Sequence, residues 1–452
     1  MLKSNLLSAV FLLIVSPAMS AKQPNIIFML SDDQAWSGLS VRMDPDNPLS
    51  ASPYDETPHL ENLATQGMRL TNAYAPSPVC SPTRASIQTG KTPASLNWTK
   101  AASTFTAEDG FKLIPPDHSR SLSSSEITLG ESLKGVGYRT AHFGKWHLLG
   151  GGPERHGFDV SDGDTGNSEA VLHKAPNPVD LFGMVERSIL FIKASQEIEK
   201  PFFVQLSFNA LHAPENALTQ TLRKYREKLG PKANVRQVAR AAINENMDSA
   251  IGLLMETLAN LGLEDETYVF FMSDNGAGGR NGVLRGGKGG LWEGGIRVPL
   301  IVKGPGIAKN SFSKVPVIGY DLLPTFLEIA GITAVQEDVE GGSMLDVLQG
   351  KGSDIYRSTP GLIFHFPHYQ GDATPQSAII REEWKVIRYY DGKRKKLFNL
   401  KNDPGEINDM VQTMPQLAAK LTDNLDSYLA QVGANLPRTN PLFNSNSVVP
   451  KR

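Results

Sequence analysis

Three short apolar runs, each followed at once by polar side chains, constrain the fold of this chain more than any other feature. Runs of this length without a polar interruption are typical of strands buried on both faces of a parallel sheet. Segments with the apolar spacing of amphipathic helices lie between them. The runs cover residues 25–30, 201–208 and 267–272, a further strand is expected over 298–302, and the helical segments include 180–195 and 234–261. This alternation predicts an α/β fold with a large, mainly parallel central sheet flanked by helices.

The texture of the sequence changes near residue 355. Short strands separated by polar turns follow, which is typical of an antiparallel sheet, and an amphipathic helix closes the region. The strands cover residues 377–380, 384–389 and 396–400, and the helix covers 413–432. Because 452 residues exceed one ordinary core, two unequal domains are expected. We predict a signal peptide over 1–20, an N-terminal domain carrying the active site over 21–355, and a C-terminal α+β subdomain over 356–452.

The first twenty residues predict export. Lys3 precedes an apolar run from Leu6 to Val15, and small residues lead to a cleavage site after Ser20 or Ala21. The run is too short for a bilayer span, which needs about 20 apolar residues, so a cleaved signal is favoured over an uncleaved anchor helix. No later stretch is long and apolar enough for stable membrane insertion after cleavage. We expect an exported bacterial protein, periplasmic or secreted.

Composition excludes some partners and draws attention to one residue. A formal net charge of −2 provides no basic surface for nucleic acid, and the oligomeric state stays open. Cys80 is the single cysteine, so no intrachain disulfide forms despite an oxidising destination. A lone cysteine is ordinarily a small buried hydrophobe. Here a helix is expected to begin just after it, over 81–91, and its free N–H groups would favour an anion beside Cys80.

The polar side chains at the predicted strand ends have the chemistry of a hard-cation site. Asp32, Asp33, Asp274 and Asn275 offer four oxygen ligands, which suit Ca²⁺ or Mg²⁺ better than zinc or copper. A turn or a helix N-cap would also explain the Ser-Asp-Asp sequence. Parallel sheets, however, gather their strand ends along one edge, where ligands bind. The sequence therefore predicts a divalent-metal site at that edge.

Cations and imidazoles accompany these carboxylates. Arg84, Lys145 and Lys288 carry positive charge, and His147 with His212 gives two acid–base candidates. In an extended chain Lys145 and His147 project to the same face, and Lys288 lies in a bracket of four glycines where the backbone can approach an anion. Solvated surface charges are the alternative for each. Together these side chains suit an oxyanion ester, either a sulfate or a phosphate.

The Cys-x-Pro-x-Arg pattern at 80–84, followed by Ala-Ser, closely resembles the signature of type I sulfatases, which belong to the alkaline-phosphatase-like superfamily. The resemblance runs through most of 24–355 and continues to a motif similar to the family's C-terminal one, Leu397-Phe398-Asn399-Leu400-x-x-Asp403-Pro404-Gly405-Glu406. It implies that Cys80 is oxidised to 3-oxoalanine (formylglycine) by a formylglycine-generating or anaerobic sulfatase-maturating enzyme. Matched by position, the implied ligands of one Ca²⁺ are Asp32, Asp33, Cys80, Asp274 and Asn275, and the implied catalytic residues are Cys80, Arg84, Lys145, His147, His212 and Lys288.

The resemblance also implies a mechanism, in which a sulfate ester is hydrolysed at sulfur. One hydroxyl of hydrated formylglycine, polarised by Ca²⁺ and Arg84, would attack the sulfur while Lys288 holds the sulfate. His212 would donate a proton to the leaving alcohol. His147 would take the proton of the second hydroxyl, which expels sulfate and restores the aldehyde, and Lys145 would stabilise the oxygens of the nucleophile.

The expected substrate is a sulfated poly- or oligosaccharide. The His-Phe-Pro-His-Tyr sequence at 365–369 is similar to segments of carbohydrate sulfatases, and it contributes to a predicted sugar subsite. The residues of this subsite are Trp98, His118, Arg155, His156, Asp162, Asp164, His365 and His368. The alternatives are an arylsulfatase of broad specificity, a phosphatase or phosphodiesterase of the same superfamily with a Ser or Thr nucleophile, and a non-catalytic module that binds sulfated glycans.

Overall fold

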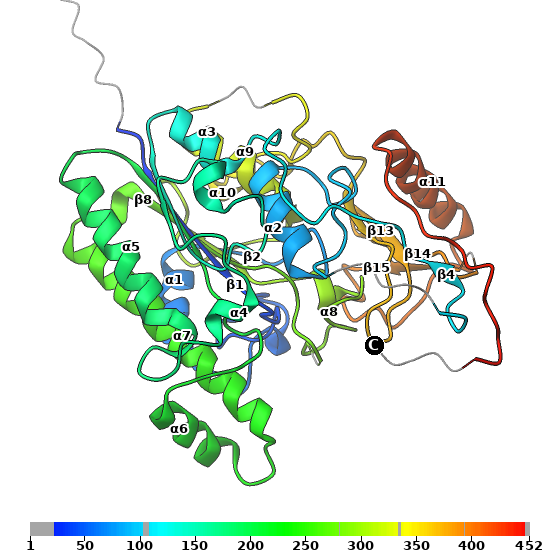
Figure 1. Cartoon of the computed structure of the whole chain (residues 1–452), viewed down its shortest axis with the longest axis horizontal. Coiled ribbons are helices and arrows are strands. Elements are labelled where there is room, and N and C mark those ends of the chain that lie inside the picture. Colours follow the sequence, from blue (N-terminus) through cyan, green and yellow to red (C-terminus); the bar gives the residue numbers. More distant parts are fainter. Residues whose placement is uncertain (1–21, 103–107, 280, 333–335, 393, 448–452) are drawn as a thin grey trace, which may run out of the picture.

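An eight-stranded sheet forms the centre of the computed structural model, which describes residues 22–102, 108–279, 281–332, 336–392 and 394–447 (Figure 1). The strand order is β10-β2-β9-β8-β1-β7-β5-β6. Neighbouring strands are parallel except at β9, which is antiparallel to both β8 and β2. The bounds are β1 Asn25–Ser31, β2 Met68–Leu70, β5 Arg139–Gly144, β6 Val160–Ser161, β7 Phe202–Ser207, β8 Thr267–Ser273, β9 Leu300–Lys303 and β10 Ser311–Ser313. The predicted signal peptide lies outside the described residues.

Helices cover both faces of this sheet because its central strand sends alternate side chains to two separate cores. Ile27 and Met29 of β1 pack in one core with helices α1, α5 and α7, whereas Ile26 and Phe28 pack in the other with α2, α3 and α9. Helix α6 lies against α7. The bounds are α1 Pro58–Gln66, α2 Cys80–Thr89, α3 Leu129–Gly135, α5 Leu181–Gln196, α6 Thr219–Leu229, α7 Val235–Asn260 and α9 Leu322–Ile329.

A four-stranded antiparallel sheet forms the C-terminal part, in the order β12-β13-β14-β15. Helix α11 packs on one face of it, and the other face packs on the large domain through Tyr74, Ile296 and Tyr320. The bounds are β12 Leu362–Phe366, β13 Gln376–Arg381, β14 Trp384–Tyr389, β15 Lys395–Asn399 and α11 Pro415–Gln431. Figure 1 shows this sheet and α11 side by side at the right-hand end of the molecule.

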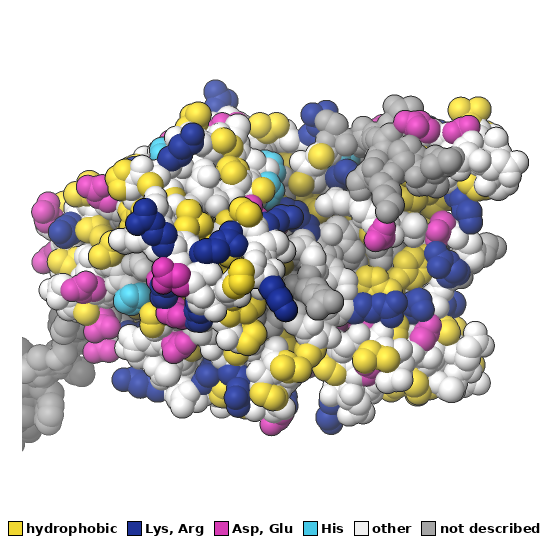
Figure 2. All heavy atoms as spheres, turned by 90° about the horizontal axis from the view of Figure 1, so that it is seen from below, with side chains coloured by type: hydrophobic (Ala, Val, Ile, Leu, Met, Phe, Trp, Pro, Cys, Tyr) yellow, Lys and Arg dark blue, Asp and Glu magenta, His cyan; other side chains and the backbone are white. Residues whose placement is uncertain are grey.

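Short elements complete the two parts. Strand β3 pairs with β11, and β4 pairs with β16, which joins the chain near residue 113 to the C-terminal segment. The bounds are β3 Ala73–Tyr74, β4 Leu113–Ile114, β11 Val317–Ile318, β16 Arg438–Thr439, α4 Asn167–Ala170, α8 Glu293–Ile296 and α10 Leu345–Leu348. On the face seen in Figure 2, acidic and basic side chains are interspersed. Among the described helices, none is both long and apolar enough to cross a bilayer.

The predicted fold class is confirmed: a mainly parallel central sheet flanked by helices is followed by a small antiparallel sheet. The division at residue 355 stays a prediction. Three local details differ from expectation. The predicted strand at 298–302 forms as β9 but runs antiparallel, α6 was not predicted, and the extended segment ends at Gly144, whose φ is 89°. His147 has a φ of 59°, so it does not continue a regular strand beside Lys145.

Candidate active site

Three carboxylates meet at the carboxyl edge of the central sheet. Asp32 and Asp33 directly follow β1, and Asp274 directly follows β8. The two strands are parallel and in register, so these side chains leave the sheet at the same level. All three residues are buried. One ligand atom from each lies within 4.8 Å of the others and of Cys80 Sγ, which makes this a compact polar cluster.

Cys80 begins helix α2 and is buried against this cluster. Val79 caps the helix without a side-chain hydrogen bond, so the first N–H groups of α2 stay available. The Cys80 Sγ lies 3.3 Å from Asp32 Oδ1. Burial, followed by the charges of Asp274 and Asp32, raises the pKa of the Cys80 thiol. An unmodified cysteine would therefore be uncharged at neutral pH and a poor nucleophile.

Two cations hold the carboxylates from the side of helix α2 and the β5 end. Arg84, one turn beyond Cys80, donates from Nε and Nη2 to Asp274 Oδ2 at 3.0 and 2.8 Å. Lys145 Nζ donates to Asp32 Oδ2, and the Lys145 carbonyl accepts from Arg84 Nη1 at 2.5 Å. Burial opposes ionisation of Asp32, but the neighbouring cations hold its pKa well below the ordinary value. This carboxylate therefore stays charged.

Lys288 approaches from a glycine-rich loop on the other side. Its Nζ lies 2.7 Å from Asp33 Oδ1 and 3.5 Å from Cys80 Sγ. The loop rests on the Cys80 segment, because the Gly289 N–H donates to the Pro78 carbonyl at 2.9 Å. The lysine is thus held in the cluster by backbone contacts, which argues against a solvated surface loop.

The donor set fits a hard divalent cation. Asn275 donates from Nδ2 to Asp33 Oδ1 at 2.6 Å, and its buried Oδ1 has no hydrogen-bond partner within the described residues. A buried carbonyl oxygen without a partner is costly, and beside three carboxylates it has the chemistry of a Ca²⁺ or Mg²⁺ ligand. Burial and repulsion by Asp32 raise the pKa of Asp274 to about 6, a strain that a nearby cation would relieve. Asp32, Asp33, Asp274, Asn275 and residue 80 could therefore hold such an ion.

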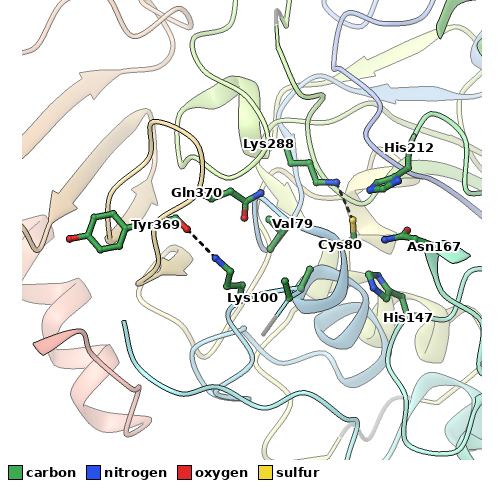
Figure 3. A pocket seen from close by; sticks show the side chains of 11 residues that line it. Val79, Cys80, Lys100, His147, Asn167, His212, Lys288, Tyr369 and Gln370 are labelled. Atoms are coloured by element: carbon green, nitrogen blue, oxygen red, sulfur yellow. Dashed lines mark hydrogen bonds between the residues drawn. The ribbon is translucent and has the colours of Figure 1, made fainter. Parts of the chain in front are cut away.

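A pocket of about 400 Å³ opens above Cys80 (Figure 3). Its walls combine the strand-edge residues with two segments distant in sequence, near residues 100 and 370. The lining residues are Val79, Cys80, Lys100, Ala101, Ala102, His147, Asn167, His212, Lys288, Tyr369 and Gln370. In Figure 3, His147, His212 and Lys288 surround the Cys80 thiol, with Lys100 and Gln370 on the far wall.

The two histidines at the pocket differ in environment. Burial, together with Lys145 and Arg84, lowers the pKa of His147 to about 3, so its imidazole is neutral at physiological pH. His212 is half-buried and donates from Nδ1 to the Ala213 carbonyl at 2.8 Å. That bond sets the tautomer and leaves Nε2 for proton exchange with a ligand. The pair offers one base and one proton carrier on either side of Cys80.

The eight residues of the predicted sugar subsite do not line this pocket. Trp98 and His118 lie behind its wall, where they donate to the carbonyls of Lys100 and Ala102 at 3.1 and 3.0 Å. His156 stacks on Trp146 in the core, with ring centroids 5.8 Å apart. Their contacts support the wall or the core instead of reaching into the pocket.

The other members of the predicted subsite also have structural contacts. Asp162 accepts from the Gly144 N–H at 2.7 Å and pairs with Arg187, and Arg155 and Asp164 are exposed away from the lining. His365 lies inside the C-terminal sheet and contacts Ser377 Oγ at 2.7 Å. His368 is buried and contacts Thr99 Oγ1 at 2.7 Å. These histidines pack between elements, as most buried histidines do.

Three polar lining residues were not predicted from the sequence, Lys100, Asn167 and Gln370, whereas Tyr369 belongs to the His-Phe-Pro-His-Tyr segment of the predicted subsite. Tyr369 ends that segment and Gln370 directly follows it, so the motif lies at the pocket wall, and the sugar-binding roles of its residues stay predictions. Asn167 begins the short helix α4 and belongs to no motif recognised in the sequence. Lys100 carries no local signal, because its place depends on packing between residues far apart in the chain.

Two models of known protein families match this chain, and together they cover the regions that form the site. The model of the sulfatase family matches residues 24–332, and the model of the C-terminal region of N-sulphoglucosamine sulphohydrolase matches residues 287–433. The first covers the central sheet and every candidate metal and catalytic residue named above. The second overlaps it and extends through the antiparallel sheet and α11.

Similar proteins include curated enzymes and solved structures. An ulvan-active sulfatase of Formosa agariphila is 28% identical, with 91% of this chain and 82% of that protein covered. Human N-acetylgalactosamine-6-sulfatase is 31% identical over 73% of this chain and 67% of its own length. The crystal structure of Ps i-CgsB in complex with k-i-k-neocarrahexaose has a TM-score of 0.75 at 22% identity, covering 90% of this chain and 93% of that chain. This last likeness bears on the fold.

Proposed function

Because this chain belongs to the sulfatase family, we propose that it removes sulfate from a sulfated poly- or oligosaccharide through a formylglycine made from Cys80. One observation carries the proposal. Cys80, Lys288 and two imidazoles line one pocket, directly above a buried carboxylate cluster that Arg84 and Lys145 neutralise in part. Such a site matches a tetrahedral oxyanion, whose negative charge faces cations fixed in place before the reaction.

The substrate class rests on the pocket and on the named relatives. A pocket of about 400 Å³ accommodates a sulfate group and roughly one sugar ring. One relative acts on ulvan, another is named for N-acetylgalactosamine 6-sulfate, and a structural neighbour was solved with a carrageenan hexasaccharide. These proteins support a carbohydrate over a simple aryl sulfate without selecting the sugar.

The chain's own side chains provide most of the proposed catalysis. Lys288 lies beside residue 80 and would hold the sulfate, Arg84 would polarise the attacking oxygen of residue 80, and Lys145 would stabilise negative charge on residue 80 itself. His212 lines the pocket, and its imidazolium form would donate the Nε2 proton to the leaving alcohol. His147, neutral because it is buried, would accept the proton that releases sulfate from residue 80. Losing any one such group costs about 100-fold or more in turnover.

Two added groups complete the proposal. A bound Ca²⁺ would polarise the residue-80 oxygen, and its ligands would be Asp32, Asp33, Asp274 and Asn275 with residue 80. Formylglycine would replace a thiol that the site keeps protonated with an oxygen nucleophile. Its formation requires a maturating enzyme of the host, which we propose as a partner of the nascent chain.

Two measurements test the proposal. Mass spectrometry of the Cys80 peptide from protein made in the native host should show loss of the thiol mass and gain of formylglycine. Sulfate release should be measured on ulvan, carrageenan and glycosaminoglycan oligosaccharides with defined sulfate positions, alongside 4-nitrophenyl sulfate and 4-nitrophenyl phosphate. Turnover of a sulfated sugar supports the proposal. An unmodified thiol in active protein, or phosphate ester turnover alone, would overturn it.

A further inference from the structure

The wall of the active-site pocket opposite Cys80 carries a second lysine. Lys100 lines the pocket from the segment after helix α2, and the turn after β12 contributes Tyr369 and Gln370 beside it (Figure 3). Lys100 is only 8% exposed, so its side chain is held in the wall. None of the described residues that line this pocket is acidic. The proposed catalytic steps use the other lining lysine, Lys288, and do not use Lys100.

The ammonium group of Lys100 lies where the backbone of Tyr369 reaches the pocket. The Lys100 Nζ donates to the Tyr369 carbonyl at 3.0 Å. The Tyr369 ring points away from the pocket, packs against Phe111 and accepts from the Leu113 N–H at its hydroxyl (Figure 3). The part of Tyr369 that lines the pocket is therefore its backbone, at the place where the lysine head is bound. A carbonyl carries no net charge, so this bond orients the ammonium without neutralising it.

The positive charge of this wall also acts on two neighbouring histidines. Burial, followed by the charge of Lys100, lowers the pKa of His368 to about 2. Burial lowers the pKa of His118 as well, and the charges of Lys100 and Arg120 add to that shift. Both imidazoles are therefore neutral at physiological pH, and Arg120 is a further cation on this side. The far wall of the pocket thus has a positive potential.

One turn of the chain connects this wall to the loop that carries Lys288. Gln370, which directly follows the residue that binds Lys100, packs so closely on Gly289 that a Cβ atom there would lie 2.8 Å from Gln370 Cγ. Two backbone hydrogen bonds between Gln370 and Ala373, at 3.1 and 2.9 Å, close the turn. The two lysines are therefore attached to opposite sides of one turn. The pocket has one cation at its reacting end and another at its far end.

We propose that Lys100 binds a second anionic group of the saccharide, in addition to the sulfate that is removed. The inference rests on the proposed function, because it supposes a saccharide sulfate at residue 80 beside Lys288. A pocket of about 400 Å³ holds this sulfate and roughly one sugar ring, so substituents of that ring or of its neighbour reach the far wall. An anion there would form a charge-assisted hydrogen bond with Lys100, which is stronger than the bond of a neutral hydroxyl. The anion can be the carboxylate of a uronic acid or a second sulfate ester.

The test uses the full-length protein with Lys100→Met, which removes the charge, and Lys100→Arg, which keeps it. Lys91→Met is the control for loss of a lysine from the same region, since Lys91 pairs with Glu126 and Asp338 and does not line the pocket. Values of kcat/KM are measured on matched pairs. The pairs are ulvan and chondroitin 6-sulfate oligosaccharides with their carboxyl-reduced forms, and N-acetylgalactosamine 4,6-disulfate with each monosulfate; 4-nitrophenyl sulfate is the reference. Calorimetry measures binding of the same sugars to Cys80→Ser protein, with and without each substitution.

The expected result is a loss of preference for the anionic member of a pair. For that member Lys100→Met should lower kcat/KM about tenfold or more, because a hydrogen bond to a charged group is lost. The neutral member and 4-nitrophenyl sulfate should keep their parent values, and Lys100→Arg should retain the preference. A loss confined to the uronic acid pairs identifies a carboxylate, and a loss confined to the disulfate pairs identifies a second sulfate.

Two results would overturn the inference. In the first, the parent protein has no preference for the anionic member of any pair. In the second, Lys100→Met weakens both members alike, or Lys91→Met has the same effect, so that Lys100 only braces the wall or binds a neutral hydroxyl. Failure of the proposed function is a separate outcome, in which no sulfate ester is cleaved. Calorimetry on the Cys80→Ser protein still shows in that case whether the anionic sugar binds more tightly and whether Lys100→Met removes the difference.

Discussion

This molecule contains two clusters of buried charged residues, which have the same residue types but different roles. The strand-edge cluster consists of Asp32, Asp33 and Asp274 with Arg84, Lys145 and Lys288. The junction cluster, between the large domain and the C-terminal sheet, consists of Glu293, Glu406, Lys385 and Arg297 with Tyr74. Both are almost fully buried. Charge and burial alone therefore do not distinguish a catalytic centre from a structural one.

The clusters differ in access. At the junction, Lys385 Nζ lies 2.9 Å from Glu293 Oε1 and 2.8 Å from Glu406 Oε1. Glu406 Oε2 accepts from the Glu293 N–H at 2.6 Å, and Tyr74 OH donates to Glu293 Oε2 at 3.0 Å. This cluster does not line the pocket above Cys80. The strand-edge cluster instead opens onto that pocket through Lys288, and within the described residues Asn275 Oδ1 beside it has no hydrogen-bond partner.

The junction cluster still has an indirect link to the chemistry. Arg285, at the start of the glycine-rich loop, donates from Nη1 to the Glu406 carbonyl at 3.1 Å, and its own carbonyl accepts from the Gly294 N–H at 2.8 Å. Lys288 lies between these two anchored points. The C-terminal part thus fixes the ends of the loop that brings Lys288 to Cys80, so the junction cluster acts on the reaction only by positioning.

The largest effect is expected from Cys80→Ser. It should reduce sulfate release by about 10⁴-fold or more, because it removes the precursor of the nucleophile. The melting temperature should change by a few degrees at most, since the serine hydroxyl occupies the space of the thiol. Turnover and thermal unfolding of the same preparation check this. Full sulfatase activity of the serine variant, made in a host that cannot oxidise serine, would contradict the proposed nucleophile.

Lys385→Met should break the junction cluster and mainly affect stability. The substitution leaves the buried Glu406 carboxylate without its cation, while Glu293 keeps Arg297, and such a loss costs about 3–5 kcal/mol of unfolding free energy. Urea denaturation followed by tryptophan fluorescence measures this, with Lys385→Arg as the charge-retaining control. If the methionine variant is as stable as the parent but inactive, the junction cluster would belong with the catalytic machinery and the comparison would fail.

The same substitution at the strand edge, Lys288→Met, should have the opposite pattern. Turnover should fall about 100-fold, because a cation facing the sulfate is lost. Unfolding free energy should change by less than in Lys385→Met, since the neighbouring Asp33 lies beside the pocket and keeps Asn275 as a partner. Measuring kcat, KM and urea midpoints on both variants sharpens the contrast. Equal losses of stability at the two lysines would show that the clusters are energetically alike.

Calcium should stabilise one cluster and leave the other unaffected. At a free concentration about 100 times Kd, Ca²⁺ should add about 2.7 kcal/mol to the unfolding free energy. A chelator should remove that increment together with activity. Asn275→Leu should abolish the shift in melting temperature, whereas Lys385→Arg should retain it. Melting curves with and without CaCl₂ test this prediction. An unchanged shift in the Asn275→Leu variant would mean that the ion binds at another site.

Most of the strand-edge cluster could be predicted from the sequence because its members follow apolar runs. In a parallel sheet the carboxyl ends of strands share an edge, so Asp32 and Asp274 are neighbours once β1 pairs with β8. The alternation of apolar runs and helices also indicated the fold class. The roles of the individual site residues remain predictions that the mutations above address.

The features of the fold and the site that could not be predicted depend on packing between segments that are distant in sequence. The direction of β9 depends on how the chain connects this strand to the preceding one. The residues of β9 itself, 300–303, do not indicate whether the strand runs parallel or antiparallel to its neighbours. Gln370 and Lys100 reach the pocket because the C-terminal sheet docks on the large domain, a contact without a periodic signal. His365, a predicted member of the sugar subsite, lies in β12 outside the pocket lining with both ring nitrogens engaged, and its role stays a prediction. Local sequence could not show which face of that strand is buried.

The smallest effect concerns pH and the junction cluster. Burial raises the pKa of Glu406 from 4.5 to about 7, so between those values the native state binds more protons than the unfolded state. Unfolding free energy should therefore fall as pH rises through this window, by at most about 1.4 kcal/mol per pH unit for one proton. Glu406→Gln removes this titration, so the difference in stability between parent and variant should itself depend on pH. Urea unfolding at pH 5, 6 and 7 measures that difference. Parallel pH dependence of the two proteins would mean that Lys385 keeps Glu406 ionised throughout, and that the junction cluster is as fully charged as the strand edge.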